Sequence, residues 1–461
     1  MKAPMKGAKT SILDAVGPTP IVRLGRIGAE LEAELYVKCE FVNPSGSAKD
    51  RMVRALVDAA EKSGELVPGG TLVEATTGNT GVALAMLAAV RGYKCVFAVP
   101  DKTSAEKIAS LRAYGARVVV APTAVDPDDP RSIYAVARKI AADVPNAWYA
   151  GQHERAETAA GHAATLGAEI WEQTGGELDA LVAGLGTGGT LVGAGRRLKE
   201  KRPEIQLIGV DPVGSLYYDF QKSGRVGTPS AYELEGLGGF HVPAPLDLSL
   251  LDEIVRVDDG DSFRVTRDLV RLEGLFAGGT SGAAVAGAIE WARRTGGKKK
   301  ILVILPDGAH GYLSKVFNDE WMREHGFLED LGGLGTVREL LAVKGGEEVI
   351  TAKDIDRVRD VVGRMKAHGI SQLPILSDGK LIGAVAEVDL LRYLVSGESS
   401  LDGAVGPLVE KEYATVSPDT RIERLQSLLS DVRMAIVLDS GRIVGVVTKI
   451  DLIDYLARRA T

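Results

Sequence analysis

Short apolar runs alternate with longer amphipathic segments over about the first 330 residues of the chain. Segments such as 50–64 and 79–92 repeat their apolar residues at helical spacing, whereas the apolar runs have the length and composition of buried strands. These runs are at 35–42, 94–100, 116–122, 178–186, 205–212 and 299–307. Strands that alternate with helices predict a mostly parallel sheet covered on both faces. Ligands bind at the carboxyl ends of such strands, so the loops there are the first candidates for a functional site.

The last part of the chain contains an internal duplication. Residues 369–394 align with residues 431–456 with little adjustment. Each copy has the pattern of a strand, a tight turn, a second strand and a helix, and the helices begin near Asp389 and Asp451. A period of about 60 residues indicates two related structural units.

Composition shifts near a glycine-rich stretch at 328–335, which we take as the boundary between two parts of the chain. A length of 461 residues is sufficient for more than one hydrophobic core. The predicted parts are residues 1–330, with a small lobe at about 46–150, and residues 331–461, with repeats at about 337–396 and 401–461.

Charge and composition argue against several classes of protein. The net charge is −7, and acidic and basic residues are interspersed, so the basic stripe of a nucleic-acid-binding surface is absent. No apolar run is long enough to span a bilayer, and the basic start lacks the apolar core of a secretory signal. Cys39 and Cys95 form no disulfide framework or zinc motif. We therefore expect a cytoplasmic protein with no nucleic-acid or membrane partner and no metal.

Lys49 lies in the most informative motif, where the turn-rich stretch 43–48 enters a helix. The positive end of a helix dipole disfavours an ammonium group, so this position favours a neutral, nucleophilic amine. Such an amine suits Schiff-base formation with a carbonyl compound. Taken alone, the same residue could also be an exposed lysine at the start of a helix.

Two further loops have the pattern of anion sites. The sequence EATTGNTG at 74–81 places hydroxyls and free N–H groups at a helix start, which fits either a carboxylate site or a capping turn. The sequence GLGTGGT at 184–190 follows an apolar strand and fits a phosphate site. It also matches G-x-G-x-x-G, and Asp211 lies 22 residues after Gly189, so a dinucleotide site is an alternative.

Together these motifs resemble the fold-type II family of cystathionine β-synthase and cysteine synthase, over about residues 1–325. The resemblance begins with the residues at 11–13 and 16–20, and it implies a pyridoxal-phosphate core of two α/β lobes with mostly parallel sheets. The implied cofactor-binding residues are Lys49 as the Schiff-base lysine, Asn79 at the 3′-oxygen, Gly186, Thr187, Gly188, Gly189 and Thr190 at the phosphate, and Thr280 at the pyridine nitrogen. The implied substrate-binding residues are Thr76, Thr77, Gly78, Thr80 and Gln152.

Some of these assignments have a neighbour as an alternative. Ser281 could replace Thr280 at the pyridine nitrogen, and by the resemblance Asp307 would lie near the same atom. A neutral hydroxyl partner would leave that nitrogen unprotonated, which suits elimination better than transamination. We expect His153 and His162 to be surface or structural residues, because the lysine can move the proton.

The chain also departs from the family pattern. Gln152 is not followed by the usual Asn-Pro segment, and the loop 235–238 is followed by Gly239 and Phe240 where cystathionine synthases often have a tyrosine and an acidic residue. That difference leaves cysteine synthase activity open. Residues 1–34 contain no Cys or His, so we expect no haem.

The duplicated tail resembles a tandem pair of CBS domains. In such pairs an acidic residue at a helix start, three positions after a Ser or Thr, can bind an adenosine ribose. Thr448 and Asp451 fit that pattern, whereas Asp389 follows Ala386 instead of a hydroxyl residue. Two other interpretations remain open, namely helix capping without a ligand and a purely structural dimerisation module.

These observations predict a pyridoxal 5′-phosphate-dependent lyase that replaces the β-substituent of serine. Homocysteine as the thiol would give cystathionine, and the tail would regulate the enzyme through S-adenosylmethionine or an adenine nucleotide. The alternatives are cysteine synthesis from O-acetylserine or serine with sulfide, a nicotinamide-dependent oxidoreductase, and a nucleotide-sensing binding protein. A homodimer or a higher homo-oligomer is expected.

Overall fold

The computed structural model divides the chain into two compact units, Met1–Leu328 and Glu329–Thr461, and each is described by itself. Among the described residues, no helix has both the length and the apolar character needed to cross a membrane. The predicted boundary at 330 lies outside the described residues. The structure describes residues 5, 7–122, 125, 129–225, 230, 232–239, 241–328, 334–345, 349–395, 400–410, 413–439 and 442–459.

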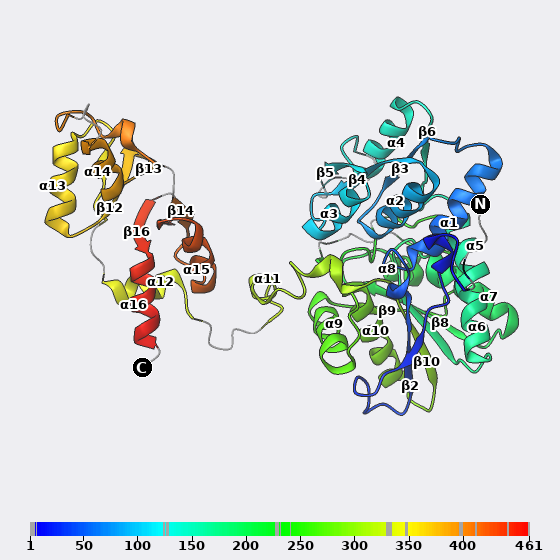
Figure 1. Ribbon diagram of the computed structural model, residues 1–461. Helices are drawn as coiled ribbons and strands as arrows, with labels where there is room; N and C mark the ends of the chain where they lie inside the picture. The colour runs from blue at the N-terminus through cyan, green and yellow to red at the C-terminus, as the bar shows by residue number, and fades with distance from the viewer. Residues whose placement is uncertain are drawn as a thin grey trace. The chain divides into compact units, whose positions relative to one another are not determined.

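A four-stranded sheet, parallel throughout, forms the small lobe of the first unit (Figure 1). Its order is β5-β4-β3-β6, with β3 (Thr71–Ala75), β4 (Lys94–Pro100), β5 (Arg117–Ala121) and β6 (Ala147–Tyr149). Alternate residues face opposite cores. Leu72 and Phe97 pack in a core with α1 and α2, and Val73 and Ala98 pack with α4. The helices are α1 (Lys49–Ser63), α2 (Asn79–Arg91), α3 (Ala105–Ala113) and α4 (Ile133–Asp143).

A six-stranded sheet forms the large lobe, and only its edge strand β1 runs antiparallel. Its order is β1-β2-β10-β7-β8-β9, with β1 (Ile21–Arg23), β2 (Glu34–Cys39), β7 (Ala180–Gly184), β8 (Gln206–Pro212), β9 (Glu253–Val257) and β10 (Lys300–Leu305). Val182 and Val303 face the core that includes α10, whereas Leu181 and Leu302 face the core that includes α7. The helices are α5 (Glu157–His162), α6 (Ala168–Thr174), α7 (Gly189–Lys201), α8 (Tyr217–Ser223), α9 (Asp259–Glu273), α10 (Gly279–Thr295) and α11 (Asp319–Glu324).

The functional loops lie where strands end and helices begin. Helix α2 starts four residues after β3 ends at Ala75, and α7 starts five residues after β7 ends at Gly184. Helix α1 begins at Lys49, after a short 3₁₀ helix, Glu40–Val42, that follows β2. The predicted strand at 35–42 therefore ends early, at Cys39, and the chain turns out of the sheet at Glu40. The parallel arrangement places these loops at one edge of each sheet.

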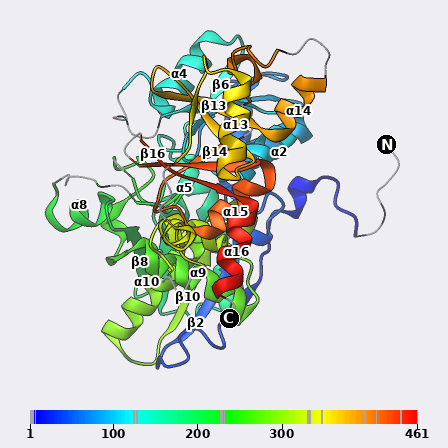
Figure 2. The same ribbon diagram turned by 90° about the vertical axis from the view of Figure 1, so that its left-hand side faces the viewer.

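The second unit contains two three-stranded sheets with matching topology, β11-β12-β13 and β14-β15-β16. In each, the first pair of strands is parallel and the second antiparallel. Figure 2 shows helices α15 and α16 of the second repeat beside each other, and they are in contact. The first repeat has β11 (Ala352–Lys353), α13 (Val358–His368), β12 (Gln372–Ser377), β13 (Lys380–Ala386) and α14 (Glu387–Val395). The second has β14 (Tyr413–Val416), α15 (Ile422–Asp431), β15 (Met434–Asp439), β16 (Arg442–Thr448) and α16 (Lys449–Arg459).

Helix α12 (Val337–Lys344) differs from the expected division of the tail. Sequence placed residue 337 at the start of the first repeat, but Val337 and Leu340 are buried in the core of the second repeat. The Val337 N–H donates to the Thr420 carbonyl, and α12 packs against α16. The apolar face of α12 is thus covered by the repeat farther along the chain, which a linear division could not show.

Candidate active site

A cavity of about 1110 Å³, including the solvent at its mouth, lies at the carboxyl ends of strands from both lobes. Ala75 and Pro100 line it from the small lobe, and Gly186 and Thr187 from the large lobe. A smaller cavity shares Lys49, Asn79 and Gly186 with it and extends under the glycine-rich loop. The cavity has room for a small-molecule ligand, whose sites typically measure about 300–1,000 Å³.

Lys49 is the first residue of α1, and its side chain is partly open to the cavity but otherwise surrounded by protein. Burial lowers its pKa from 10.5 to about 8, although Asp307 and Glu74 favour the cation. A substantial fraction of the amine is therefore neutral near pH 8 and able to act as a nucleophile. The Ala48 N–H donates to the Pro306 carbonyl at 2.8 Å, which fixes the start of α1 beside the end of β10.

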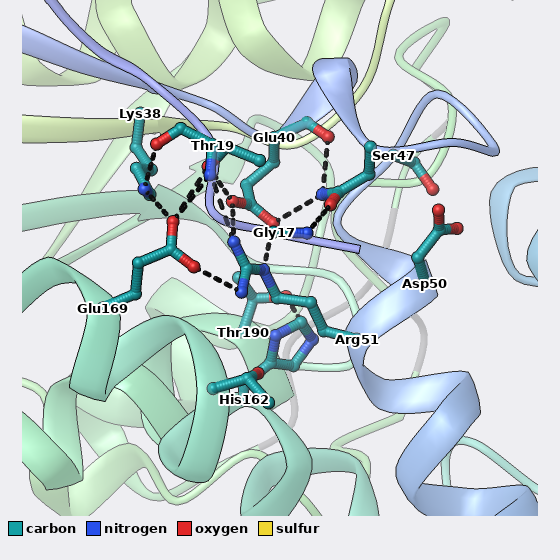
Figure 3. A network of polar contacts seen from close by, with 12 residues as sticks. Gly17, Thr19, Lys38, Glu40, Ser47, Asp50, Arg51, His162, Glu169 and Thr190 are labelled. Atoms are coloured by element: carbon teal, nitrogen blue, oxygen red, sulfur yellow. Dashed lines mark hydrogen bonds and ion pairs between the residues drawn. The ribbon is translucent and has the colours of Figure 1, made fainter. Parts of the chain in front are cut away.

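A largely buried ionic network around Arg51, two residues after Lys49, holds the start of α1 in place (Figure 3). Arg51 donates through Nε and Nη2 to the two oxygens of Glu40, at 2.7 and 2.8 Å, and its Nη1 is 2.8 Å from Glu169. Lys38 pairs with the same Glu169 from β2. Because removing one partner leaves an unpaired buried charge, a break here costs about 3–5 kcal/mol of folding free energy. The network thus connects β2, α1 and α6 beneath the site.

The loop after β3 presents some of its side chains to the cavity and uses others to hold its own shape. Thr77, Asn79 and Thr80 line the cavity. Thr76 is buried, and its hydroxyl oxygen accepts the N–H groups of Gly78 and Gly81, at 3.0 and 3.2 Å. Gly78 has φ of +133°, and a Cβ there would lie 2.7 Å from Lys107 Cδ, so only glycine fits. Thr76 and Gly78 are not among the residues that line the cavity.

Gln152 lies at the cavity wall and is tied to this loop from the neighbouring strand end. The Thr80 hydroxyl donates to its Oε1 at 2.6 Å, and the Gln152 N–H donates to Glu74 at 3.1 Å. Glu74 is fully buried beneath the loop, and burial raises its pKa to about 8. The sequence analysis gave Glu74 no role. A carboxylate inside an otherwise apolar strand was the available signal.

The glycine-rich loop after β7 brings backbone close to a cavity. Gly188 has φ of +74°, and a Cβ there would lie 2.9 Å from the Cα of Leu246. A Cβ at Gly186 would lie 2.8 Å from the Gly236 carbonyl oxygen. Gly186, Thr187, Gly188 and Thr190 line the smaller cavity, at the N-terminus of a 13-residue helix. Free N–H groups and the helix dipole make this an anion site.

Asp307 is the common hydrogen-bond acceptor of three polar side chains. Thr280 donates to Oδ1 at 2.8 Å, Asn79 donates to Oδ2 at 2.8 Å, and Tyr312 donates to the same Oδ2. Ser281 instead donates to the backbone carbonyl of Asp307 at 3.2 Å, and is fully buried. Thr280 therefore faces the smaller cavity while Ser281 does not. Asp307 received only a minor role in the sequence analysis, because 228 residues separate it from Asn79.

Aromatic rings and one lysine form the outer wall of the larger cavity. The rings of Tyr134, His153 and His241 are 5.4–5.8 Å apart. His153 thus lines the cavity and is not a surface residue, and burial lowers its pKa to about 3, so the ring is neutral. Lys102 lies over the Tyr232 ring at 5.2 Å. Burial also lowers the pKa of Lys102, against the influence of Glu235.

Lys102 has no ion-pair partner within 4 Å among the described residues. Glu235, the acidic residue with the largest electrostatic effect on Lys102, is already paired with Lys107 at 2.6 Å and with Lys315. Among the described lining residues of the larger cavity, Lys49 and Lys102 carry the amine side chains. Lys102 is therefore a cation available to a ligand.

Gly239 marks the place where the chain departs from the family pattern. A Cβ at this position would lie 2.2 Å from the Tyr217 hydroxyl oxygen. That hydroxyl comes from α8 and donates to the Gly186 carbonyl at 3.0 Å. Tyr217 thus occupies the space that a side chain at 239 would need. Phe240 lies outside the described residues.

The geometry does not support a dinucleotide site at the glycine-rich loop. Asp211 is completely buried, its Oδ2 accepts the Tyr218 N–H at 3.0 Å, and it does not line either cavity. A ribose could not reach this carboxylate without displacing α8. Asp211 instead caps the start of that helix.

In the tail, both predicted aspartates accept a backbone N–H at the start of a helix. Asp451 accepts the Thr448 N–H and hydroxyl, each at 2.7 Å, and Lys344 of α12 lies 2.9 Å from the same oxygen. Asp389 accepts the Ala386 N–H at 2.9 Å and is 3.2 Å from Arg433. Both carboxylates cap their helices and are also paired with a cation.

The residues around Lys49 fit pyridoxal phosphate. The amine with the lowered pKa suits an aldehyde, the glycine loop at a helix N-terminus suits a phosphate, and the hydroxyl and amide groups of Thr280 and Asn79 can bind ring substituents. Residues 12–307 match the family described as "Pyridoxal-phosphate dependent enzyme", and residues 342–396 and 405–458 match the CBS domain. The chain is thus a pyridoxal-phosphate-dependent enzyme with tandem CBS domains, and the predicted fold and cofactor are confirmed.

Relatives cover nearly the whole chain. Proteins named "Cystathionine beta-synthase" are 34% identical in Dictyostelium discoideum, over 97% of this chain and 92% of the relative, and 31% identical in Saccharomyces cerevisiae, over 98% of each. Among solved structures, an O-acetylserine-dependent cystathionine beta-synthase from Helicobacter pylori has a TM-score of 0.61 and 36% identity, over 67% of this chain and 98% of that one. A hydrogen sulfide-producing enzyme from Fusobacterium nucleatum has a TM-score of 0.62 and 30% identity, over 66% and 100%. The chain therefore belongs to the cystathionine beta-synthase family.

Proposed function

We propose that this enzyme condenses serine with homocysteine to give cystathionine and water, and that Lys49 is its catalytic residue. The observation that carries the proposal is the position of the Lys49 amine, with a pKa near 8, on the wall that the two cavities share. The names of the relatives support the same reaction. Pyridoxal phosphate, when bound, stabilises the negative charge that develops at the substrate Cα.

The proposed roles of the protein residues follow from their positions. Thr77, Thr80 and Gln152 would bind the serine carboxylate, with Thr76 and Gly78 shaping their loop. Asn79 and Thr280 would bind the ring of the cofactor, and residues 186–190 its phosphate.

Lys49 would carry the protons of the reaction. It takes the proton from serine Cα and gives it to the β-hydroxyl as the Cβ–O bond breaks and water leaves. The homocysteine sulfur loses its proton to the lysine and bonds to Cβ. Lys49 then returns a proton to Cα, so atoms and charge balance.

Lys102 supports homocysteine over sulfide as the second substrate. Homocysteine carries a carboxylate that must be bound away from the first amino acid, whereas sulfide carries none. Lys102 lies on the outer wall, over Tyr232, with no acidic partner within 4 Å among the described residues. A cation on the wall of a partly enclosed cavity, with no acidic partner of its own, attracts such a group.

The test is product analysis by mass spectrometry, with serine or O-acetylserine as donor and homocysteine or sulfide as acceptor. We expect cystathionine from serine plus homocysteine, and Lys49→Ala should abolish it while the protein stays folded. Borohydride reduction of the native enzyme should attach the cofactor mass to the peptide that contains Lys49. If cysteine from sulfide exceeds cystathionine by orders of magnitude, the enzyme is a cysteine synthase instead.

The role of Lys102 is tested by Lys102→Met. Loss of one hydrogen-bonded charge pair should raise the KM for homocysteine by about 10-fold, and leave the KM for serine and for sulfide unchanged. Lys222→Met is the matched control, because Lys222 also lies over a tyrosine ring but outside the cavity. An unchanged KM for homocysteine would contradict this assignment alone.

We further propose that the tail binds an adenosyl compound through Thr448 and Asp451, with S-adenosylmethionine first and AMP or ATP next, and that Asp389 marks a weaker site. The match to CBS domains supports a small-molecule ligand in general. We propose a cytoplasmic location, which the unpaired thiols of Cys39 and Cys95 support.

A further inference from the structure

His162 lies at the end of α5, against the first turns of α7, and is completely buried. Its Nε2 is 3.2 Å from the hydroxyl oxygen of Thr190 (Figure 3). Its Nδ1 is also buried, and no hydrogen-bond partner for it lies among the described residues. The proposed function gives this histidine no role.

Two glycines of α7 fix the ring in this position. A Cβ at Gly189 would lie 2.6 Å from Thr158 Cγ2, and a Cβ at Gly193 would lie 2.2 Å from the Ala159 carbonyl oxygen and 2.8 Å from His162 Cβ. Helices α5 and α7 therefore pack so closely that α7 has no room for a side chain at these two positions. A ring held in such close packing has little freedom to leave Thr190.

The protonation state of His162 follows from its surroundings. Burial lowers the pKa of His162 well below its ordinary value, and the cations of Lys49 and Arg51 act in the same direction. The ring is therefore neutral, with one proton. A proton on Nδ1 would leave a buried donor without an acceptor, whereas a proton on Nε2 is donated to Thr190.

We infer that His162 is a positioning residue that makes the Thr190 hydroxyl a hydrogen-bond donor to the cofactor phosphate. Because Thr190 accepts from Nε2–H, its own proton is free to point into the smaller cavity, which Thr190 lines. A phosphate can only accept, so the opposite tautomer would turn oxygen lone pairs toward the anion. The inference rests on the proposed placement of the phosphate at residues 186–190.

Three substitutions test this chain of hydrogen bonds from His162 through Thr190 to the phosphate. They are made in Lys49→Ala protein, which cannot bind the cofactor covalently. His162→Leu removes the donor, His162→Gln keeps a donor that does not titrate, and Thr190→Val removes the hydroxyl. The dissociation constants of pyridoxal phosphate and of inorganic phosphate are measured by calorimetry on the full chain. We expect about 10-fold weaker binding for His162→Leu and for Thr190→Val, no further loss in the double variant, and recovery in His162→Gln.

The tautomer is read directly by nitrogen-15 NMR of the wild-type apoenzyme with labelled histidine. The His162 signal is identified as the one that is missing from the spectrum of His162→Gln. In the wild type this signal should show a proton on Nε2, none on Nδ1, and no titration between pH 6 and 9. A proton on Nδ1, or phosphate binding by the His162→Leu variant equal to that of its Lys49→Ala parent, would overturn the inference. If the Thr190→Val variant binds phosphate as tightly as this parent, the proposed phosphate site is wrong instead.

Discussion

At the scale of single residues, the ionisation of Lys49 makes the proposed chemistry possible. A lysine with the ordinary pKa of 10.5 would be almost entirely protonated at pH 7, whereas burial brings the pKa of Lys49 to about 8. The folded-state pKa is depressed, so the neutral amine gains population as the pH rises toward 8. Covalent capture of the cofactor should follow that population.

We predict that the rate of covalent pyridoxal-phosphate uptake by the apoenzyme rises about tenfold with each unit of pH increase up to pH 8, and that it levels off above pH 8. Stopped-flow absorbance from pH 6 to pH 9 measures this rate. Lys49→Ala should show no covalent uptake at any pH and serves as the control. A rate that still rises about tenfold between pH 8 and pH 9 would mean that the Lys49 pKa is not lowered.

The sequence allowed some site residues to be predicted and concealed others. Lys49, Asn79 and the glycine-rich loop lie in contiguous motifs, so their local pattern was sufficient to select them. Asp307 accepts hydrogen bonds from Thr280 and Tyr312 and also from Asn79, which belongs to α2 of the small lobe and is 228 residues away in the chain. Lys102 belongs to no recognisable motif in the sequence. It lines the cavity because it follows β4, which lies beside β3 in the sheet of the small lobe.

At the scale of elements, the start of α16 combines a cap with a candidate ligand site. Lys344 of α12 lies 2.9 Å from Asp451, so a ribose that binds this carboxylate must replace the lysine. Both side chains are partly exposed, and such a pair contributes at most about 1 kcal/mol. The binding energy of a ligand can therefore offset the loss of the Lys344–Asp451 ion pair.

We predict that Lys344→Met tightens the binding of S-adenosylmethionine, AMP or ATP roughly two- to five-fold, and that Asp451→Asn abolishes it. Isothermal calorimetry on the full chain measures both effects. Lys366→Met, an exposed lysine on α13, is the control and should leave binding unchanged. Binding by Asp451→Asn equal to wild type would place the ligand elsewhere.

Element positions were less predictable where polar residues interrupt a pattern. Strand β3 is buried at every position, yet Glu74 within it weakens the apolar signal, and the sequence analysis did not identify this strand. At Glu40 the error is the opposite one. The apolar run looks like a single strand, but the strand ends before Glu40, whose carboxylate accepts a hydrogen bond from Arg51. The buried ionic partners that explain both positions are distant in sequence.

At the scale of the whole molecule, the duplicated tail presents the same apolar face twice. Val388 and Leu391 on α14 occupy the repeat positions of Ile450 and Ile453 on α16, and all four side chains are exposed. Exposed apolar patches mark interaction surfaces, and homo-oligomers most often assemble about a twofold axis that pairs the same patch on both copies. A second copy of this chain is therefore the partner we propose.

We predict that Leu391→Glu combined with Ile453→Glu reduces the mass of the assembly in sedimentation equilibrium, because burying four carboxylates in a symmetric dimer is unfavourable. Ile355→Glu, which alters an exposed isoleucine of the same unit outside these helices, should leave the mass unchanged. An unchanged mass in the double variant would mean that this face is not an interface.

Helix α12 precedes both repeats in the chain but packs on the second repeat, so the first and last helices described in the tail are in contact. The segment that leaves the catalytic unit first becomes α12, and α12 carries Lys344, the cation that holds Asp451. Helix α12 therefore contributes a side chain to the candidate ligand site itself. A ligand that displaced Lys344 from Asp451 would therefore act on the packing of α12 against α16, and no rearrangement of the first repeat is required for that effect.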